Sequence, residues 1–562
     1  ERPSNLTIPE LFPENRANRR PDVNLRQGYG SLYSWAWPWY NLLRIHTWDD
    51  KWSFTKGVHT LKFGGLVQYQ IKDQEAFGRT QGYFSFNGQN TGNAVADMVL
   101  GMPASYQELD IQRLGEYRYW QLELFFQEDW KIARNFTLNL GLRYFYIPHL
   151  WEKNDAITTF VPSKWDPARA PQLDPYSGAI IPGTGDLLNG VIRAGTEGVP
   201  RGLTDNSKKD FAPRIGFAWN PTGAPRLVVR GGYGIGYYRV EGNDTYDFIN
   251  YPPFAQNVTI NRPPLDNPAA GAAAPAYPPA MGLFEELFDP PQVHQWSFGF
   301  QINTSEWLFN NSMLEIAYVG SHISRLPLSR NINTPLPVDG YDFSPEINEG
   351  VKSTNYFRPY RGFAGITQRE TSGRSNYNSL QMSFDKRYSD GLKLGVAYTF
   401  SKAMNTLTNF DSTPQNAYKP ELDYALADWD VTHNMTFNYI YQLPFLRDAG
   451  GVVEAILGGW QLSGIVVLQS GNMRNIGLSL PHTGLATRPD LVADPEGPET
   501  VAQWFNTAAV VQPAYGFYGN AGRNLVRGPN LRRWDAAVMK NFRLPWFAGE
   551  SSNLQVRAEA FN

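Results

Sequence analysis

About a dozen stretches of this sequence alternate strictly between apolar and polar residues. The clearest spans 136–146 (FTLNLGLRYFY), where Leu138, Leu140 and Leu142 alternate with polar residues that include Arg143. Successive side chains of a β-strand point to opposite faces, so this stretch has one apolar face and one polar face. Aromatic residues gather at the ends of such stretches, and Gly, Asn, Ser, Thr and Arg occupy the polar faces. The repetition predicts an all-β fold, a transmembrane antiparallel β-barrel with lipid outside and water inside.

The composition excludes several other classes of protein. The 562 residues carry a formal net charge of −3 and include no cysteine. We therefore expect no nucleic-acid partner, no disulfide framework and no cysteine-based metal site. Mean hydropathy is −0.42, and the sequence contains no run of about 18 apolar residues that would form a transmembrane helix. The chain starts at Glu1 without a signal peptide, which suggests a mature or truncated product.

Candidate strands occur in pairs joined by short links rich in Gly, Asn, Asp and Pro, the composition of hairpin turns. Fourteen strands are expected, at 41–54, 59–70, 105–131, 136–146, 211–219, 226–238, 293–303, 312–320, 376–388, 392–401, 429–441, 460–469, 531–542 and 553–561, with a possible fifteenth at 29–37. Long connections separate the pairs, at approximately 75–104, 150–210, 240–292, 326–375, 402–428 and 470–530. This alternation predicts tight turns at one end of a barrel and large loops at the other, as in outer-membrane barrels.

The stretch at 105–131 is compatible with two interpretations. If the short links on both sides of 105–131 lie at the same end of the barrel, only one strand fits there. We expect a single long strand, bent near Gly115, in preference to a stretch whose first half belongs to a loop. The preceding GNAVADMVLG at 92–101 predicts a short helix within that loop, and NPAAGAAAPAYPPA at 267–280 predicts a flexible loop tip.

Several of these segments resemble one known family. FFQEDWKIARNFTLNLGLRYFY, at 125–146, resembles a hairpin of TonB-dependent outer-membrane receptors. Other segments resemble the Oar-like subgroup of that family. They are HTLKFGG (59–65), FAPRIGFAWNPTG (211–223), VVRGGYGIGYYR (228–239), LEIAYVGSHISRLP (314–327), NYNSLQMSFDKRYSDGLKLGVAYTFSKAM (376–404) and LQVRAEAFN (554–562). The resemblance implies a 22-stranded barrel around an N-terminal plug. We expect 1–562 to be a partial barrel that lacks the plug, the N-terminal domain and the final strand.

Charged residues on the polar faces are the first candidates for a functional site. They would contact a plug or line a substrate path, whereas the alternative is ordinary solvation of the inner wall. A lipid-facing arginine in mid-strand costs about 2–4 kcal/mol, so Arg143 and Arg230 are expected to face the lumen. The full set of candidates is Arg143, Arg230, Asp385, Asp430, Arg557 and Glu559.

Aromatic residues near strand ends are expected to form girdles at the membrane interfaces. These interface candidates are Trp120, Trp130, Tyr144, Tyr146, Trp429, Tyr441 and Trp460, together with Trp35, Trp37, Trp39 and Tyr40. For the cluster at 35–40, stacking on carbohydrate is the alternative.

Neither the glycines nor the histidines show the pattern of a phosphate-binding or metal-binding site. Gly232, Gly234 and Gly236 alternate with large residues, so we expect a strand whose lumen face leaves room for a plug or substrate, and not a phosphate-binding loop. The seven histidines are scattered singly and have no metal-motif spacing. We expect no catalytic residue, no metal and no cofactor.

Three functions fit these patterns to different degrees. The first is a TonB-dependent transport barrel in a bacterial outer membrane, whose loops capture a ligand. Its expected partners are membrane lipid, TonB acting through a plug, and an unknown ligand, with loops that favour glycans or peptides. The second is an outer-membrane anchor or scaffold that holds a surface or periplasmic protein without transport. The third, a secreted β-rich enzyme, is disfavoured by the alternating loop lengths.

Overall fold

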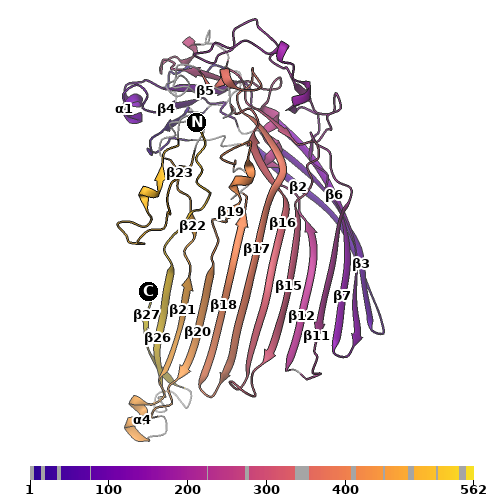
Figure 1. The fold of residues 1–562 in the computed structure, drawn as a ribbon, viewed down its shortest axis with the longest axis vertical. Coiled ribbons are helices and arrows are strands. Elements are labelled where there is room, and N and C mark those ends of the chain that lie inside the picture. The colour runs from indigo at the N-terminus through magenta and orange to yellow at the C-terminus, as the bar shows by residue number, and fades with distance from the viewer. Residues whose placement is uncertain are drawn as a thin grey trace.

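The computed structural model describes residues 6–13, 19–33, 40–75, 78–224, 226–271, 277–335, 353–406, 413–446, 450–478, 487–513, 517–543 and 552–562. One large antiparallel sheet dominates them and forms a tall curved wall (Figure 1). Among these residues, no helix has both the length and the apolar character needed to cross a bilayer.

Fourteen long strands of the described chain follow one another across the wall in sequence order, each antiparallel to the next. They are β2 (Asn41–Lys56), β3 (His59–Glu75), β6 (Leu114–Ala133), β7 (Phe136–Tyr146), β11 (Asp210–Trp219), β12 (Leu227–Tyr237), β15 (Gln292–Asn303), β16 (Ser312–Asn331), β17 (Ile366–Ser389), β18 (Leu392–Asn405), β20 (His433–Gln442), β21 (Gln461–Gln469), β26 (Leu531–Arg543) and β27 (Asn553–Ala560). The count expected from the sequence is confirmed. The possible fifteenth strand lies partly outside the described residues, and its described part forms only the isolated bridge Val23–Leu32.

The two faces of the wall differ as the alternation predicts. On β7, Leu138, Leu140 and Leu142 share one face, which we call the apolar face. Arg143 lies on the opposite face, where its guanidinium reaches Glu123 of β6. We call this second face the inner wall. Large apolar side chains stand exposed along the apolar face on many strands, as expected for a surface in contact with lipid.

Short and long connections separate to opposite ends of the wall (Figure 1). We call these the turn end and the loop end. The loop end carries the short elements β8 (Trp151–Glu152), β9 (Thr158–Phe160), β10 (Val191–Arg193), α2 (Asn243–Tyr246), β14 (Met281–Phe284), β19 (Ala425–Leu426), β22 (Met473–Arg474), β23 (Asp490–Leu491), β24 (Val510–Val511) and β25 (Val526–Arg527). One helix, α4 (Gly451–Leu457), lies at the turn end. The predicted asymmetry of the connections is confirmed.

The prediction of a single strand over 105–131 is wrong. β5 (Ser105–Leu109) leaves the wall and pairs instead with two strands of the loop end, in a small separate sheet. Tyr106 of β5 is fully buried, with its ring centroid 4.6 Å from that of Phe84. Glu108 lies on the same side of β5 and accepts a hydrogen bond from the hydroxyl of Tyr106, so this side is buried in a loop core and is not a lipid-facing surface.

That small sheet consists of β1 (Asp22–Leu25), β4 (Tyr83–Phe86), β5 and β13 (Asn257–Asn261). The adjacent helix α1 (Ala94–Val99) confirms the helix expected at 92–101, and the side chain of Asn93 caps it by accepting from the amides of Val95 and Ala96.

The loop expected at 326–375 is shorter in the structure. β16 runs on to Asn331 and β17 begins at Ile366, so the two strands remain paired well above the other hairpins. A strand needs about 9–11 residues to cross a bilayer, so these strands rise beyond it. Their register shifts between Ile323 and Leu328, and this irregularity interrupts the alternation that sequence reasoning relies on.

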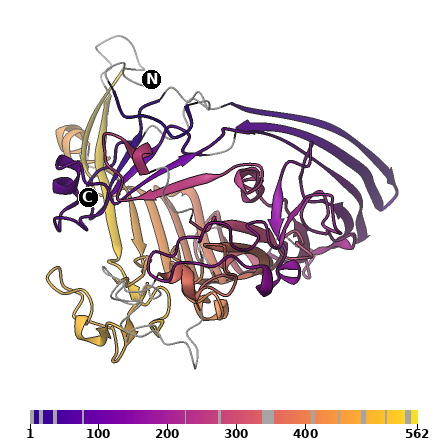
Figure 2. The same ribbon diagram turned by 90° about the horizontal axis from the view of Figure 1, so that it is seen from above.

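The wall does not close on itself. Within the described residues, β2 pairs only with β3, and β27 pairs only with β26. Viewed from above, the sheet is an open arc from its indigo strands to its yellow strands (Figure 2). The inner wall therefore lines a trough.

Two neighbouring positions on β15 test which face meets lipid. Phe298 is 46% exposed on the apolar face, and Ser297 is exposed on the inner wall opposite Gly232. We expect Phe298→Arg to lower the free energy of unfolding in lipid vesicles by about 2–4 kcal/mol. Ser297→Arg should change it by less than about 1 kcal/mol, because its side chain enters water. Urea titrations monitored by heat-dependent mobility in gels measure both, and equal losses would contradict the assignment of faces.

Candidate functional site

A large groove runs along the inner wall across seven adjacent strands, from β6 to β17. Its volume is about 1160 Å³, which is in the range of sites that hold drug-sized or larger ligands. Its lining includes residues from both faces of the strands. Those on the inner wall are mostly uncharged, namely Phe125, Gln127, Asn139, Gly141, Ala212, Gly216, Gly232, Gly234, Gly236, Val293, Gln295, Ser297, Val319, Ser321 and Tyr377, with Lys51, Arg143 and Arg214 as the cations.

Glycine forms the floor of this groove. Gly216 of β11 pairs directly with Gly232 of β12, and two further glycines, Gly141 of β7 and Gly234 of β12, lie next to them on either side of Arg214. A Cβ atom at Gly141 or Gly216 would meet its nearest neighbour at 3.6 Å, an ordinary contact. Packing within the wall therefore does not demand glycine at those two positions. The missing side chains leave space above the wall, as the sequence predicted for Gly232, Gly234 and Gly236.

Arg214 stands in the middle of this glycine floor and was missed by sequence reasoning. Its backbone lies between Gly141 of β7 and Gly234 of β12. Its Cγ atom lies 3.2 Å from the position that a Cβ of Gly234 would take, so the side chain extends over that glycine. The side chain is exposed to the trough. Alternation along 211–219 is the signal that places Arg214 on the inner wall. Its position between Gly141 and Gly234 depends on the pairing of three strands, which the sequence alone does not give.

Arg143 is the one predicted candidate that lines the groove. Its Nε lies 3.0 Å from a carboxylate oxygen of Glu123, and its guanidinium lies 5.5 Å from the ring centroids of both Phe125 and Phe145. These contacts hold the cation flat against the wall. Arg143 is therefore committed to neighbours within the wall, and Arg214 is the more available cation.

The other predicted charges lie elsewhere. Arg230 is exposed on the inner wall of β12, opposite Gly299, and Asp385 is exposed on β17 close to the turn end. Arg557 and Glu559 contact each other on the inner wall of the edge strand β27. The structure thus brings together only this last pair among the six candidates.

Asp430 does not line the lumen at all. It lies in a bend before β20, 1% exposed, where its carboxylate accepts from the amide of Ala403 at 2.7 Å and pairs with Arg527 at 2.8 Å. This bend delays the strand expected from 429, which begins at His433. Asp430 therefore ties the loop before β20 to the long loop before β26.

The aromatic candidates lie at both ends of the apolar face. Trp120 and Tyr146 meet edge to face at 5.2 Å towards the loop end, and Tyr144 lies 5.1 Å from Phe211 beside them. The other candidates lie at or beyond strand ends: Trp130 stacks on His59 at the turn end, Tyr441 ends β20, Trp460 precedes β21, and Trp429 and Tyr40 are exposed at the loop-end margin. Trp35, Trp37 and Trp39 lie outside the described residues.

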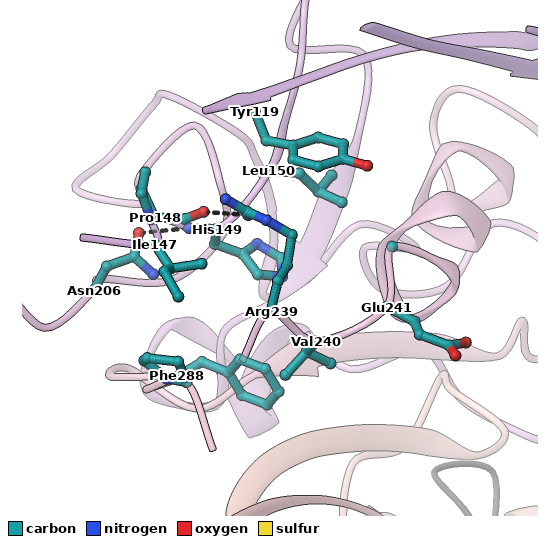
Figure 3. A pocket seen from close by; sticks show the side chains of 12 residues that line it. Tyr119, Ile147, Pro148, His149, Leu150, Asn206, Arg239, Val240, Glu241 and Phe288 are labelled. Atoms are coloured by element: carbon teal, nitrogen blue, oxygen red, sulfur yellow. Dashed lines mark hydrogen bonds between the residues drawn. The ribbon is translucent and has the colours of Figure 1, made fainter. Parts of the chain in front are cut away.

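Where the wall meets the loops, Arg239 fastens three segments together around a cavity of about 30 Å³, enough for one or two water molecules (Figure 3). Its guanidinium donates to the backbone carbonyls of Pro148 at 2.9 Å and Trp120 at 2.8 Å, and lies 4.7 Å from the ring centroid of Tyr119. Burial lowers the pKa of Arg239 to about 10, so the side chain stays charged at neutral pH. This junction fixes the base of the loop that follows β12.

His149 lies in the same junction as a neutral imidazole. Its Nδ1 donates to the carbonyl of Gly202 at 2.7 Å, which leaves Nε2 to accept from the hydroxyl of Thr245 at 3.3 Å. Burial, opposed by the bond to Gly202 and assisted by the charges of Arg239 and Arg369, lowers the pKa of His149 to about 4. The closed junction therefore excludes the protonated form.

This arrangement predicts a loop junction that weakens in acid. An opened His149 takes up a proton near its ordinary pKa of 6.5, whereas the closed form does so only near 4. The closed form binds fewer protons, so its stability is lost as the pH falls from about 6.5 towards 4. Hydrogen exchange in 147–151 and 200–204, corrected for intrinsic rates, should be faster at pH 5 than at pH 7.5. His149→Gln should flatten this dependence, and an unchanged dependence in that variant would exclude His149 as the cause.

The described residues contain no group of three or more His, Asp or Glu side chains close enough to hold a metal ion. Their notable features are the groove in the wall and the loops anchored above it. The arrangement suits non-covalent binding.

Solved structures of several outer-membrane proteins are similar to this chain. The outer membrane transporter YddB from Escherichia coli is 10% identical, with 92% of this chain and 50% of that chain covered and a TM-score of 0.46. The siderophore receptor PiuA from Acinetobacter baumannii is 10% identical over 92% of this chain and 52% of its own, with a TM-score of 0.40. The ferric yersiniabactin uptake receptor FyuA from Yersinia pestis is 8% identical over 92% and 48%, with a TM-score of 0.38.

The chain thus spans about half the length of these solved structures. No curated protein matches it significantly in sequence. The profile of the family described as "Outer membrane beta barrel domain" matches residues 2–562. With its two-faced wall and its separated turns and loops, this chain belongs to that family of outer-membrane β-barrel proteins.

Proposed function

We propose that this chain is the channel wall of a TonB-dependent receptor of the Oar-like type, which takes up a ligand through the bacterial outer membrane. The groove on the inner wall carries the proposal. A wall built only for stability would fill its inner face with side chains, whereas here glycine and small polar residues form much of the inner-wall floor of a groove of about 1160 Å³, beside larger residues such as Phe125 and Tyr377. Such a surface leaves room for a plug, for a passing ligand, or for each in turn.

The chemistry of the groove supports an uncharged or weakly anionic ligand, such as a glycan or a peptide. Amides and hydroxyls of Gln127, Asn139, Gln295 and Ser297 offer hydrogen bonds of both senses, and the ring of Tyr377 offers a stacking surface. Arg214 adds an exposed cation, suited to a carboxylate. A highly anionic ferric siderophore would favour a denser positive lining.

Two partners belong to this proposal. A plug would occupy the trough and transmit energy from TonB, and further strands would pair with the edges of β2 and β27. Unpaired backbone groups at a sheet edge cost several kcal/mol each in lipid, which supports closure of the ring. The chain would carry out no bond chemistry.

The alternative is an outer-membrane anchor that binds a protein at the cell surface without transport. One observation favours it: the loops bury an aromatic core against the loop-end part of β6, in which Tyr117 of that strand packs with Phe248 and Phe284. A loop end with such a core presents a preformed surface. Transport requires an open groove, whereas anchoring does not.

Gly216 and Ile215 form a matched pair for the test. Gly216 lies in the groove with room for a Cβ, and Ile215 is 50% exposed on the opposite, apolar face. Cells that produce the receptor are supplied with defined oligosaccharides, peptides and a ferric siderophore, and depletion of each from the medium is measured by mass spectrometry. Gly216→Trp should slow depletion of one compound class about tenfold or more, and Ile215→Trp should leave it unchanged.

A collapse of the proton-motive force should abolish the same depletion, because TonB needs that energy. If neither Gly216→Trp nor the collapse changes the depletion of any compound, transport is excluded and anchoring remains. Surface levels of each variant, measured with an antibody against the loops, control for assembly.

A further inference from the structure

The turn between β20 and β21 differs from the other turns at its end of the wall. It is the longest of them, and within it α4 (Gly451–Leu457) projects beyond the lower margin of the sheet (Figure 1). Helices are otherwise confined to the loop end in the described part of the chain. A barrel hairpin closes with a few residues, so the extra length needs another explanation.

The side chains of α4 are exposed and apolar. Val452 is 72% exposed, and Val453, Ile456 and Leu457 are between 48% and 56% exposed. At 100° per residue these four positions form one stripe, and Glu454 lies away from it. Phe445, just before the helix, is 68% exposed. A continuous exposed patch of this kind marks a surface that another apolar phase covers.

A buried lysine fixes which side of the wall the helix occupies. Lys540 of β26 is 5% exposed, and its ammonium donates to the carbonyl of Glu454 at 3.1 Å and to the carbonyl of Gly458. By register, Lys540 shares the apolar face with Val538 and lies opposite Val556. The C-terminal end of α4 is therefore held on the apolar side of the wall.

The ammonium gives the carbonyl of Glu454 a second donor beside the amide of Gly458, and a cation at the C-terminal end of a helix is favoured by the helix dipole. The indole Nε1 of Trp460 donates to the carbonyl of Ile456 at 3.1 Å and adds a second tie to the base of β21. The position of α4 is thus built into the turn.

The patch on α4 continues along the turn end. Neighbouring turns and strand ends also expose large apolar side chains, namely Val58, Ile132, Trp307, Leu308, Phe309 and Tyr388. These residues are distributed over several turns at this end of the wall, and we call them together the apolar rim. In outer-membrane barrels the short turns face the periplasm, so this rim is level with the headgroups of the periplasmic leaflet.

We propose that α4 is an in-plane membrane anchor, which lies in the headgroup region of the periplasmic leaflet with Val452, Val453, Ile456 and Leu457 inserted among the acyl chains. Its partner is the glycerophospholipid surface itself. Among the described residues, Glu454 is the only charged side chain on the helix, and the only cation that contacts the helix is the buried Lys540, so apolar burial drives the contact and salt should affect it little. The proposal rests on the outer-membrane location and not on transport.

A depth measurement tests this directly. The chain has no cysteine, so Ile456→Cys and Glu454→Cys each provide a unique site for an environment-sensitive fluorophore. The labelled full-length protein is reconstituted in vesicles of phosphatidylethanolamine and phosphatidylglycerol that contain brominated lipid. We expect bromines to quench the label at position 456 at least twofold more than the label at 454. Aqueous iodide should show the opposite preference.

Equal iodide quenching at both positions would overturn the proposal, because a helix free in the periplasm exposes both. Shielding of position 456 in native outer membranes but not in pure lipid vesicles would also overturn it, since a protein would then be the partner. A second measurement avoids the label, which could disturb the turn. It uses the unlabelled double variant Val452→Ser and Ile456→Ser. Protease cleavage within 450–460 should be at least fivefold faster in this variant than in the parent protein, both in lipid vesicles.

Discussion

Hydrogen bonding between neighbouring strands is the constraint on which this structure depends. Inside a bilayer no water is present to satisfy backbone amides and carbonyls, so each strand must bond to the strands beside it. The fourteen long strands do so in sequence order, which makes every neighbour in the wall a neighbour in the chain. This order leaves side chains free to specialise by face, with apolar groups towards lipid and small polar groups towards the trough.

That specialisation explains why the inner wall can support a groove. The wall is held together by its backbone ladder and its apolar face, and glycine at Gly141, Gly216 and Gly232 removes neither of these interactions. The same residues in a soluble core would leave cavities, with a cost set by the lost contacts. Arg214 extends over this floor without a bulky neighbour beside it, which makes it the cation best placed to meet a molecule in the trough.

The loops solve a different problem. They lie beyond the bilayer and behave as soluble structure, so they bury their own aromatic cores and tie their bases to the wall with buried polar contacts. Asp430 with Arg527 and Arg369 with Asp244 are ion pairs of this kind. Removing one partner of such a pair would destabilise the loop base, because the remaining charge would lose its counter-charge at a site with little access to water. The neutral imidazole of His149 belongs to the same anchoring system.

The sequence by itself determined the class of fold, the number of long strands, the faces of residues such as Leu142 and Arg143, and the separation of turns from loops. These follow from local alternation and from the spacing of turn residues, which a single chain records directly. Glycine at 232, 234 and 236 was assigned to the inner wall for the same reason.

Only the tertiary structure decided which partners the less regular segments found. The stretch at 105–109 forms a strand, yet it pairs in a small sheet at the loop end, and Asp430 is buried in a loop instead of facing the trough. The floor around Arg214 and the position of α4 beside Lys540 depend on contacts between residues far apart in the chain. Alternation specifies that a residue has a face, but the pairing of distant strands specifies what that face meets.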